Sequence, residues 1–225
     1  MITDMFSKPL RVIAASLLVL LGSALVTGQD KPKLSYGLLL DSTGSMRSQF
    51  ETVLGIGKAI VHETAPHGPV SIFNFASEGI GKGSRAVPVA RIEQSQDEAR
   101  LNMTIDGLYV QGGQTALLDA IQFISDRLHA WQPDGDKVIV IVSDGEDRVS
   151  KVKAKELIQQ LKDRKIKVFA VGLVRELDSD KRSKAAKLLQ ILTSKTGGVA
   201  VIPKSRDVDV QQMLVELALP VAPRN

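Results

Sequence analysis

Three short segments carry oxygen-bearing side chains that are suited to holding a metal ion. The first, Asp41-Ser-Thr43-Gly-Ser45, follows an apolar run that is typical of a buried strand. The second, Gly112-Gly-Gln-Thr115, precedes apolar residues at helical spacing, and the third, Ser143-Asp144-Gly-Glu-Asp147, follows another apolar run. Ligands of parallel α/β sheets bind beyond the carboxyl ends of the strands, so we expect these segments to meet. The candidate ligands are Asp41, Thr43, Ser45, Thr115 and Asp144.

The chemistry of these five side chains favours a hard divalent cation. Carboxylates and hydroxyls without histidine or cysteine suit Mg²⁺, Mn²⁺ or Ca²⁺ and argue against zinc and copper. The chain contains no cysteine, which also excludes a disulfide framework and a thiol nucleophile. Two carboxylates and three hydroxyls would leave the charge of the ion incompletely neutralised. Such an ion would attract one more carboxylate from a partner.

Each candidate also has a simpler structural explanation. Thr43 or Ser45 could cap the helix that follows, Thr115 could cap its own helix, and Asp144-Gly145 is a common turn pair. The occurrence of all three segments at predicted strand ends favours a shared site. Three neighbouring acids could support the ligands through hydrogen bonds, cap helices or face solvent: Asp119, Glu146 and Asp147.

Strand and helix patterns alternate along the chain. The predicted strands are Leu34–Leu40, Val70–Ala76, Ala86–Ile92, Lys137–Val142, Val168–Val171 and Val199–Ile202. The predicted helices are Phe50–Thr64, Ser95–Met103, Thr115–Trp131, Lys151–Arg164, Ser179–Thr196 and Val208–Leu219. Alternation of this kind implies right-handed crossovers and a doubly wound, mostly parallel sheet in an α/β domain.

The N-terminus has the pattern of a secretory signal. A weakly basic start is followed by the apolar stretch VIAASLLVLLGSALVTG and then by a polar restart at Gln29. We therefore expect a signal peptide over residues 1–28 and a single domain over 29–225, with its core at about 31–220. A membrane-spanning helix would want about twenty apolar residues, and an uncleaved N-terminal anchor is the alternative. Either interpretation predicts a secreted or periplasmic domain.

Other motifs carry less information. The net charge of +4 is modest, and the densest basic run, Lys151 to Lys167, has the spacing of a solvated helix face, so nucleic acid is not expected. The glycine-rich stretch Gly79–Ser84 fails as a phosphate-binding loop, because Ala76 stands where the first glycine would be.

The segments LLLDSTGSM, GGQTALLDAI and VIVIVSDGED resemble the three motifs of von Willebrand factor A-type (VWFA) domains, and the order of elements agrees over the mature chain. The resemblance implies a sheet of about six strands, with Ala86–Ile92 antiparallel and helices on both faces. It also implies a metal-ion-dependent adhesion site (MIDAS). Thr43 and Ser45 would ligate the ion directly, Asp41 and Asp144 directly or through water, and Thr115 depending on conformation. Thr43 stands where the family usually has serine; it keeps the hydroxyl, but its methyl group could alter geometry or affinity.

These observations predict a non-enzymatic protein-binding module for adhesion, in which the Asp or Glu of a protein partner completes a Mg²⁺-type ion. No membrane span is expected after signal cleavage, and the pattern indicates no oligomeric state. One alternative is a Mg²⁺-dependent phosphatase of the haloacid dehalogenase type, which also begins with an aspartate after a buried strand. Such enzymes want a second acid two residues later, where this chain has Thr43. A third possibility is a scaffold whose site has lost its metal.

Overall fold

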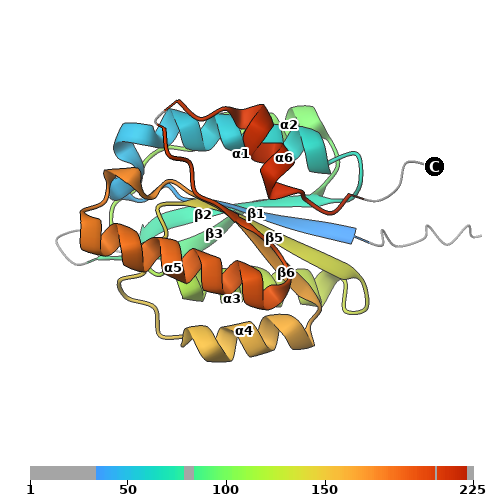
Figure 1. Cartoon of the computed structure of the whole chain (residues 1–225). Helices are drawn as coiled ribbons and strands as arrows, with labels where there is room; N and C mark the ends of the chain where they lie inside the picture. Colours follow the sequence, from blue (N-terminus) through green and yellow to red (C-terminus); the bar gives the residue numbers. More distant parts are fainter. Residues whose placement is uncertain (1–33, 79–83, 206, 222–225) are drawn as a thin grey trace, which may run out of the picture. The chain divides into compact units, whose positions relative to one another are not determined.

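The computed structural model describes residues 34–78, 84–205 and 207–221 of the 225-residue chain. The predicted signal peptide, residues 1–28, lies outside the described residues. The described elements form an α/β arrangement with three helices on each face of one sheet (Figure 1).

The sheet has seven strands in the order β4-β3-β2-β1-β5-β6-β7. All neighbouring pairs are parallel except β2 and β3, which are antiparallel. The doubly wound, mostly parallel α/β fold is therefore confirmed. The strands are β1 (Leu34–Leu40), β2 (Val70–Glu78), β3 (Arg85–Ser95), β4 (Gln114–Thr115), β5 (Asp136–Ser143), β6 (Ile166–Gly172) and β7 (Ala200–Val201).

The sheet has one strand more than expected, because Gln114–Thr115 forms a two-residue strand beside β3. The sequence pattern predicts no strand here and places Thr115 at the start of a helix, which in the structure begins at Leu117. A strand of two residues is too short to show the alternation of apolar and polar residues by which strands are recognised.

The six helices divide between the two faces of the sheet. Three contribute to the core cluster on one face, and three contribute to the cluster on the other (Figure 1). The first group is α1 (Phe50–Thr64), α2 (Glu98–Asp106) and α6 (Val210–Leu217), and the second is α3 (Leu117–Trp131), α4 (Ala154–Asp163) and α5 (Ser179–Thr196). None of the helices in the described part of the chain has the length and apolar character that crossing a membrane requires.

The central strands supply both core clusters because successive side chains of a strand point to opposite faces. In β1, Leu38 and Leu40 join the cluster under α1, whereas Leu39 joins the cluster under α3. Strand β5 divides its residues in the same way. Since both faces are covered, β1 is buried along its whole length, which is why its sequence is a nearly continuous apolar run.

The register of β1 aligns its end with the end of β5 and with the middle of β2. Leu40, its last residue, lies opposite Asn74 of β2 and Val142 of β5. Asp41 and Ser143 therefore follow at the same edge of the sheet. Loops that begin here start from a fixed and fully buried position.

Candidate functional site

The five candidate ligands gather at the carboxyl edge of the sheet. Asp41 follows β1, Thr115 ends β4, and Asp144 follows β5. Thr43 donates from Oγ1 to Oδ1 of Asp41 over 2.7 Å, and it lies 3.2 Å from the Ser45 hydroxyl. The Thr115 hydroxyl reaches Thr43 Oγ1 at 3.2 Å. Asp144 lines a depression together with Ser45, so side chains from three separate loops meet as the sequence predicted.

Asp41 is the most completely bonded side chain of this group. It is fully buried, and its Oδ1 accepts hydrogen bonds from both the backbone N–H and the hydroxyl of Thr43. Its Oδ2 accepts from the Ser143 hydroxyl over 2.6 Å. These bonds fix the orientation of the carboxylate before any ion arrives.

Sequence reasoning missed the residues that hold the first loop in place. The buried Ser42 hydroxyl donates to the Phe75 carbonyl over 3.0 Å and accepts from the Asn74 side chain over 3.1 Å. Arg91 Nε on β3 donates to Oδ1 of Asn74 over 2.6 Å. A polar chain thus runs from β3 through β2 to the loop after β1. An asparagine inside the apolar run of β2 was the signal that could have revealed it.

The second and third loops are joined to each other. The Thr115 carbonyl accepts from the backbone N–H groups of Arg148 and Val149 at 2.9 and 3.3 Å. Asp147 Oδ1 accepts from the Leu117 N–H at 2.8 Å, so it caps the first turn of α3. These bonds make the loops after β4 and β5 one connected structure.

The capping explanations for the threonines are wrong. Thr43 precedes a 3₁₀ helix, Gly44–Gln49, without making a side-chain capping bond. The N-cap position of α3 is Ala116, and Asp147 supplies the capping oxygen that Thr115 does not. For Asp144 the turn interpretation is partly right, because its Oδ1 accepts from the Glu146 N–H at 2.9 Å.

The two other neighbouring acids already have partners. Asp119 pairs with Arg85 and accepts from the backbone N–H groups of Lys151 and Val152. Glu146 pairs with Arg148 and lies 3.6 Å from the Lys181 ammonium group. These contacts hold the loop after β5 against α3 and α5.

The site concentrates negative charge in a buried position. Burial first, and then the nearby Asp144 carboxylate, raise the pKa of Asp41 to about 6. Burial also raises the pKa of Asp144, although the N–H of Glu146 and the hydroxyl of Ser45 oppose this shift. Two buried carboxylates in one site repel each other, and a cation between them would remove that cost.

One buried atom fits a metal ion directly. Asp144 is 1% exposed, and its Oδ2 is buried without a hydrogen-bond partner. Buried carboxylate oxygens are normally paired, so an unpaired one on a side chain that also interacts with the Ser45 hydroxyl is chemically suited to an ion. The described residues contain no cluster of three or more acidic, histidine or cysteine side chains suited to a metal. Any ion at this edge would therefore depend on the hydroxyls of Thr43, Ser45 and Thr115.

The model of the von Willebrand factor type A domain matches residues 37–214. Among solved structures, the chain is similar to the conserved hypothetical protein BatB from Bacteroides thetaiotaomicron, with 17% identity and a TM-score of 0.61 over 82% of this chain and 97% of that one. It is also similar to the pilus adhesin SpaC from Lactobacillus rhamnosus GG in its open conformation, with 16% identity and a TM-score of 0.60 over 83% of this chain and 30% of that one.

A further similar structure is the manganese-loaded TRAP protein of Plasmodium vivax, with 16% identity and a TM-score of 0.52 over 69% of this chain and 63% of that one. At these identities the structural matches show the fold. A comparison with curated proteins gave no significant match. The family match covers most of the chain, and the fold agrees with it. The chain therefore belongs to the von Willebrand factor type A domain family, a family of adhesion and protein-interaction modules.

Proposed function

We propose that this chain is a non-enzymatic, metal-dependent module that binds a protein partner. Asp41, Thr43, Ser45, Thr115 and Asp144 would hold a Mg²⁺-type ion, with Mn²⁺ and Ca²⁺ as the other candidates. The observation that carries the proposal is the buried, unpaired Oδ2 of Asp144 beside a second buried carboxylate. When bound, the ion would supply an open coordination position for an Asp or Glu carboxylate of the partner.

The residues of this chain prepare such a site in two ways. The hydrogen bonds to Asp41 fix its carboxylate, so little side-chain freedom is lost when an ion binds. The hydroxyls of Thr43 and Ser45 carry no charge, so they add no negative charge that would repel a carboxylate of the partner. Family membership supports this function, and so does the presence of a pilus adhesin and a manganese-loaded protein among the similar structures.

We also propose that residues 1–28 are a cleaved signal peptide and that 29–225 form one secreted or periplasmic domain. Mass spectrometry of the exported protein would test this. A mass that starts near Gln29 supports cleavage, whereas a full-length mass supports an N-terminal anchor. The phosphatase alternative gains no support, because Thr43 binds Asp41 and Thr115 through its hydroxyl where such enzymes need an acid.

Titration calorimetry tests the ion site. We expect measurable Mg²⁺ or Mn²⁺ binding by the wild-type protein and none by the Asp41→Ala/Asp144→Ala variant. The Asp134→Ala/Asp180→Ala variant is the matched control, since it removes the same charge from two exposed positions. Unchanged binding in the first variant would contradict the site assignment.

A pull-down with and without EDTA, followed by identification of the eluted protein, tests the function. A partner held through the ion should be lost in chelator and should return when Mg²⁺ is added. It should also be lost when its own contacting Asp or Glu is replaced. A partner retained equally well in chelator would argue against metal-mediated recognition.

A further inference from the structure

Charge is divided unevenly along this chain. Residues 151–196 contain thirteen lysines and arginines against five acids, a net charge of +8. Residues 34–150 contain nine basic and fifteen acidic residues, a net charge of −6. The modest charge of the whole chain therefore conceals a strongly basic segment, residues 151–196.

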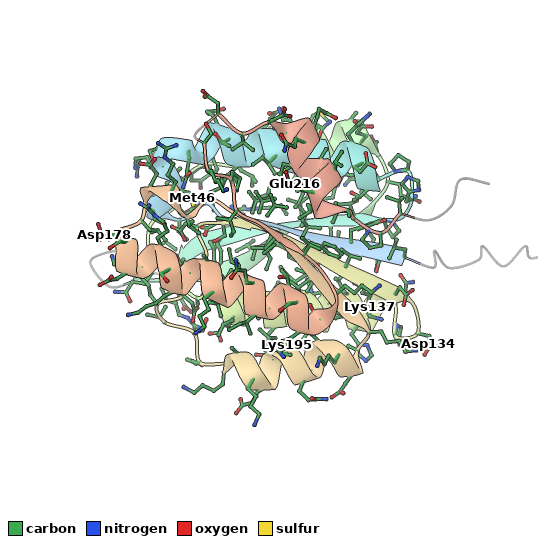
Figure 2. The ribbon with its side chains drawn as sticks, in the orientation of Figure 1. Met46, Asp134, Lys137, Asp178, Lys195 and Glu216 are labelled. Atoms are coloured by element: carbon green, nitrogen blue, oxygen red, sulfur yellow. The ribbon has the colours of Figure 1, made fainter. Side chains whose placement is uncertain are left out.

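The fold places both helices of this basic segment on one face of the sheet. Helices α4 and α5 contact each other and cover the same side of the sheet (Figure 1). Lys195, labelled in Figure 2, lies on the side of α5 toward α4 in this view. The exposed basic side chains of the segment include Lys155, Lys162, Lys181, Lys184, Lys187 and Lys195.

Helical spacing brings the lysines to the seam between α4 and α5. Lys155 and Lys162 lie three residues before and four residues after Ile158, a partly buried residue of the core cluster under these helices. Lys184 and Lys195 lie four residues before and seven residues after Leu188, which is partly buried in the same cluster. Lysines from both helices therefore border the line along which the helices pack.

Most of these charges are not neutralised within the domain. In the described part of the chain, ion pairs on this face involve Arg164, which pairs with Asp126, and Lys181, which lies near Glu146 and Asp178. Arg182 donates to two backbone carbonyls. The lysines at the seam form no ion pair, so their field extends into solvent.

We propose that the α4–α5 face docks this domain on the surface of an anionic lipid bilayer, without crossing it. The complementary charge is that of acidic lipid headgroups, which attract clustered basic side chains. Ten of the thirteen basic residues are lysines, which act as point charges rather than as bidentate readers of a specific phosphate. The aromatic residue of the segment is Phe169, which is buried, so the face lacks the stacking platforms that favour single-stranded nucleic acid.

This docking would leave the proposed metal site accessible. Helix α5 begins at the carboxyl edge of the sheet, where Lys181 approaches Glu146, and it then runs away from that edge. A domain lying on α4 and α5 would hold the candidate site at its side, open to a partner. The docking proposal rests on charge alone and does not depend on the metal site.

Vesicle co-sedimentation tests the proposal. The protein used is the form isolated from cells after any cleavage of the N-terminal segment. We expect binding to vesicles of equal parts phosphatidylglycerol and phosphatidylcholine, and little binding to pure phosphatidylcholine. Binding should weaken steeply between 0.05 and 0.5 M salt, roughly the range over which the screening length falls below 10 Å. The Lys155→Gln/Lys162→Gln/Lys184→Gln/Lys195→Gln variant should bind at least about a hundredfold more weakly, because each lysine contributes roughly fivefold.

The matched control is the Arg47→Gln/Lys58→Gln/Arg100→Gln/Lys204→Gln variant, which removes the same charge away from this face. It should retain binding to within severalfold, and both variants keep the same N-terminus. Equal losses in the two variants would overturn the proposal, as would equal binding to neutral vesicles. Tighter binding to a short DNA duplex at the same salt would also overturn the proposal. It would indicate that this face binds nucleic acid rather than a bilayer. Circular dichroism of both variants shows whether they are folded.

Discussion

The hydroxyl of Ser143 donates to Oδ2 of Asp41 over 2.6 Å, across 102 residues of sequence. Both side chains are fully buried, and they lie where β1 and β5, the two central strands, end. The same hydroxyl accepts from the Gly145 N–H at 3.0 Å, so it also fixes the loop that carries Asp144. Ser143 therefore links the two acidic loops of the candidate site, although it is not itself a candidate ligand.

Replacing this link should destabilise the domain. Ser143→Ala leaves a buried carboxylate oxygen and a buried N–H unpaired, which costs about 1–3 kcal/mol. Urea unfolding in EDTA measures the loss without a contribution from bound metal. The control is Ser183→Ala on the exposed surface of α5, for which a change within about 0.5 kcal/mol is expected. Equal stability of the two variants would show that the Ser143 bond contributes nothing.

The raised pKa of Asp41 predicts a pH dependence of stability without metal. The folded state holds the Asp41 proton up to about pH 6, against an ordinary value of 3.8. The resulting stabilisation is present below about pH 4 and is lost as the pH rises through 6. It is on the order of 3 kcal/mol, since a tenfold change in proton affinity is worth about 1.4 kcal/mol.

This dependence is measured by thermal unfolding in EDTA between pH 4 and 8, comparing the wild type with Asp41→Asn. The side chain of Asp41→Asn does not titrate in this range. The stability of the wild type relative to Asp41→Asn should therefore fall as the pH rises from 4 to 8. Added Mg²⁺ should reverse the trend, because protons then compete with the ion for the same carboxylates. A constant difference across the range would contradict the burial of an ionisable Asp41.

Two variants of Thr43 separate the contributions of its hydroxyl and its methyl group to Mg²⁺ affinity. Thr43→Ser keeps the hydroxyl that binds Asp41, so Mg²⁺ affinity should stay within severalfold of the wild type. Thr43→Val keeps the shape but removes the oxygen, and affinity should fall by more than about tenfold. Calorimetry at one pH and salt concentration compares the three proteins. Wild-type affinity in Thr43→Val would exclude this residue from the ligand set.

The chain from Arg91 through Asn74 to Ser42 should position the first loop. Asn74→Ala removes the buried middle of the chain, whereas Arg91→Ala removes only its exposed end. We expect both stability and Mg²⁺ affinity to fall more in Asn74→Ala than in Arg91→Ala, with a stability loss of about 1–3 kcal/mol for Asn74. Lost stability with unchanged affinity would mean that the chain supports the sheet but not the site.

Lys137 provides a contrasting case at the start of β5, far from the candidate site. Its buried ammonium group donates to the carbonyls of Gln132 and Pro133 at 2.8 and 3.2 Å. Figure 2 shows Lys137 and Met46, which follows the first loop of the candidate site, at opposite ends of the sheet. Lys137→Met should lower stability by about 1–3 kcal/mol and leave Mg²⁺ affinity unchanged. Unfolding experiments measure the stability, and calorimetry measures the Mg²⁺ affinity. A loss of affinity would show that the two ends of β5 are coupled.

Elements with long periodic patterns were predicted at their observed bounds. Strand β1 and helices α1 and α5 coincide with the predicted ranges, because apolar residues mark their extent and Pro66 and Gly197 mark the ends of the two helices. The predicted helix Ser95–Met103 is displaced, since β3 continues to Ser95 and α2 begins after Asp97, whose side chain accepts from the Arg100 N–H at 3.0 Å. Pairing with β2 extends β3, and that pairing is a tertiary contact which a local pattern does not contain.

The site was predictable to a similar degree. The residue types and the spacing of the three polar segments indicated which side chains would meet, because parallel strands place their carboxyl ends on one edge of the sheet. They did not indicate Ser143, Ser42 or Asn74, whose roles depend on strand register. A serine or asparagine in or beside a strand has many local uses, and only the register shows that Ser143 and Asn74 face the first loop, to which Ser42 itself belongs.

The capping of α3 by Asp147 limits how this protein can be modified. The helix takes its capping oxygen from a residue thirty positions later in the chain, and the same loop bonds back to Thr115. Any insertion or deletion between Asp144 and Ser150 would thus uncap α3 as well as shift an acidic residue. Length variation in this loop should be poorly tolerated during evolution. A peptide inserted in this loop for display would therefore disturb the N-terminus of α3 and would not be confined to the surface.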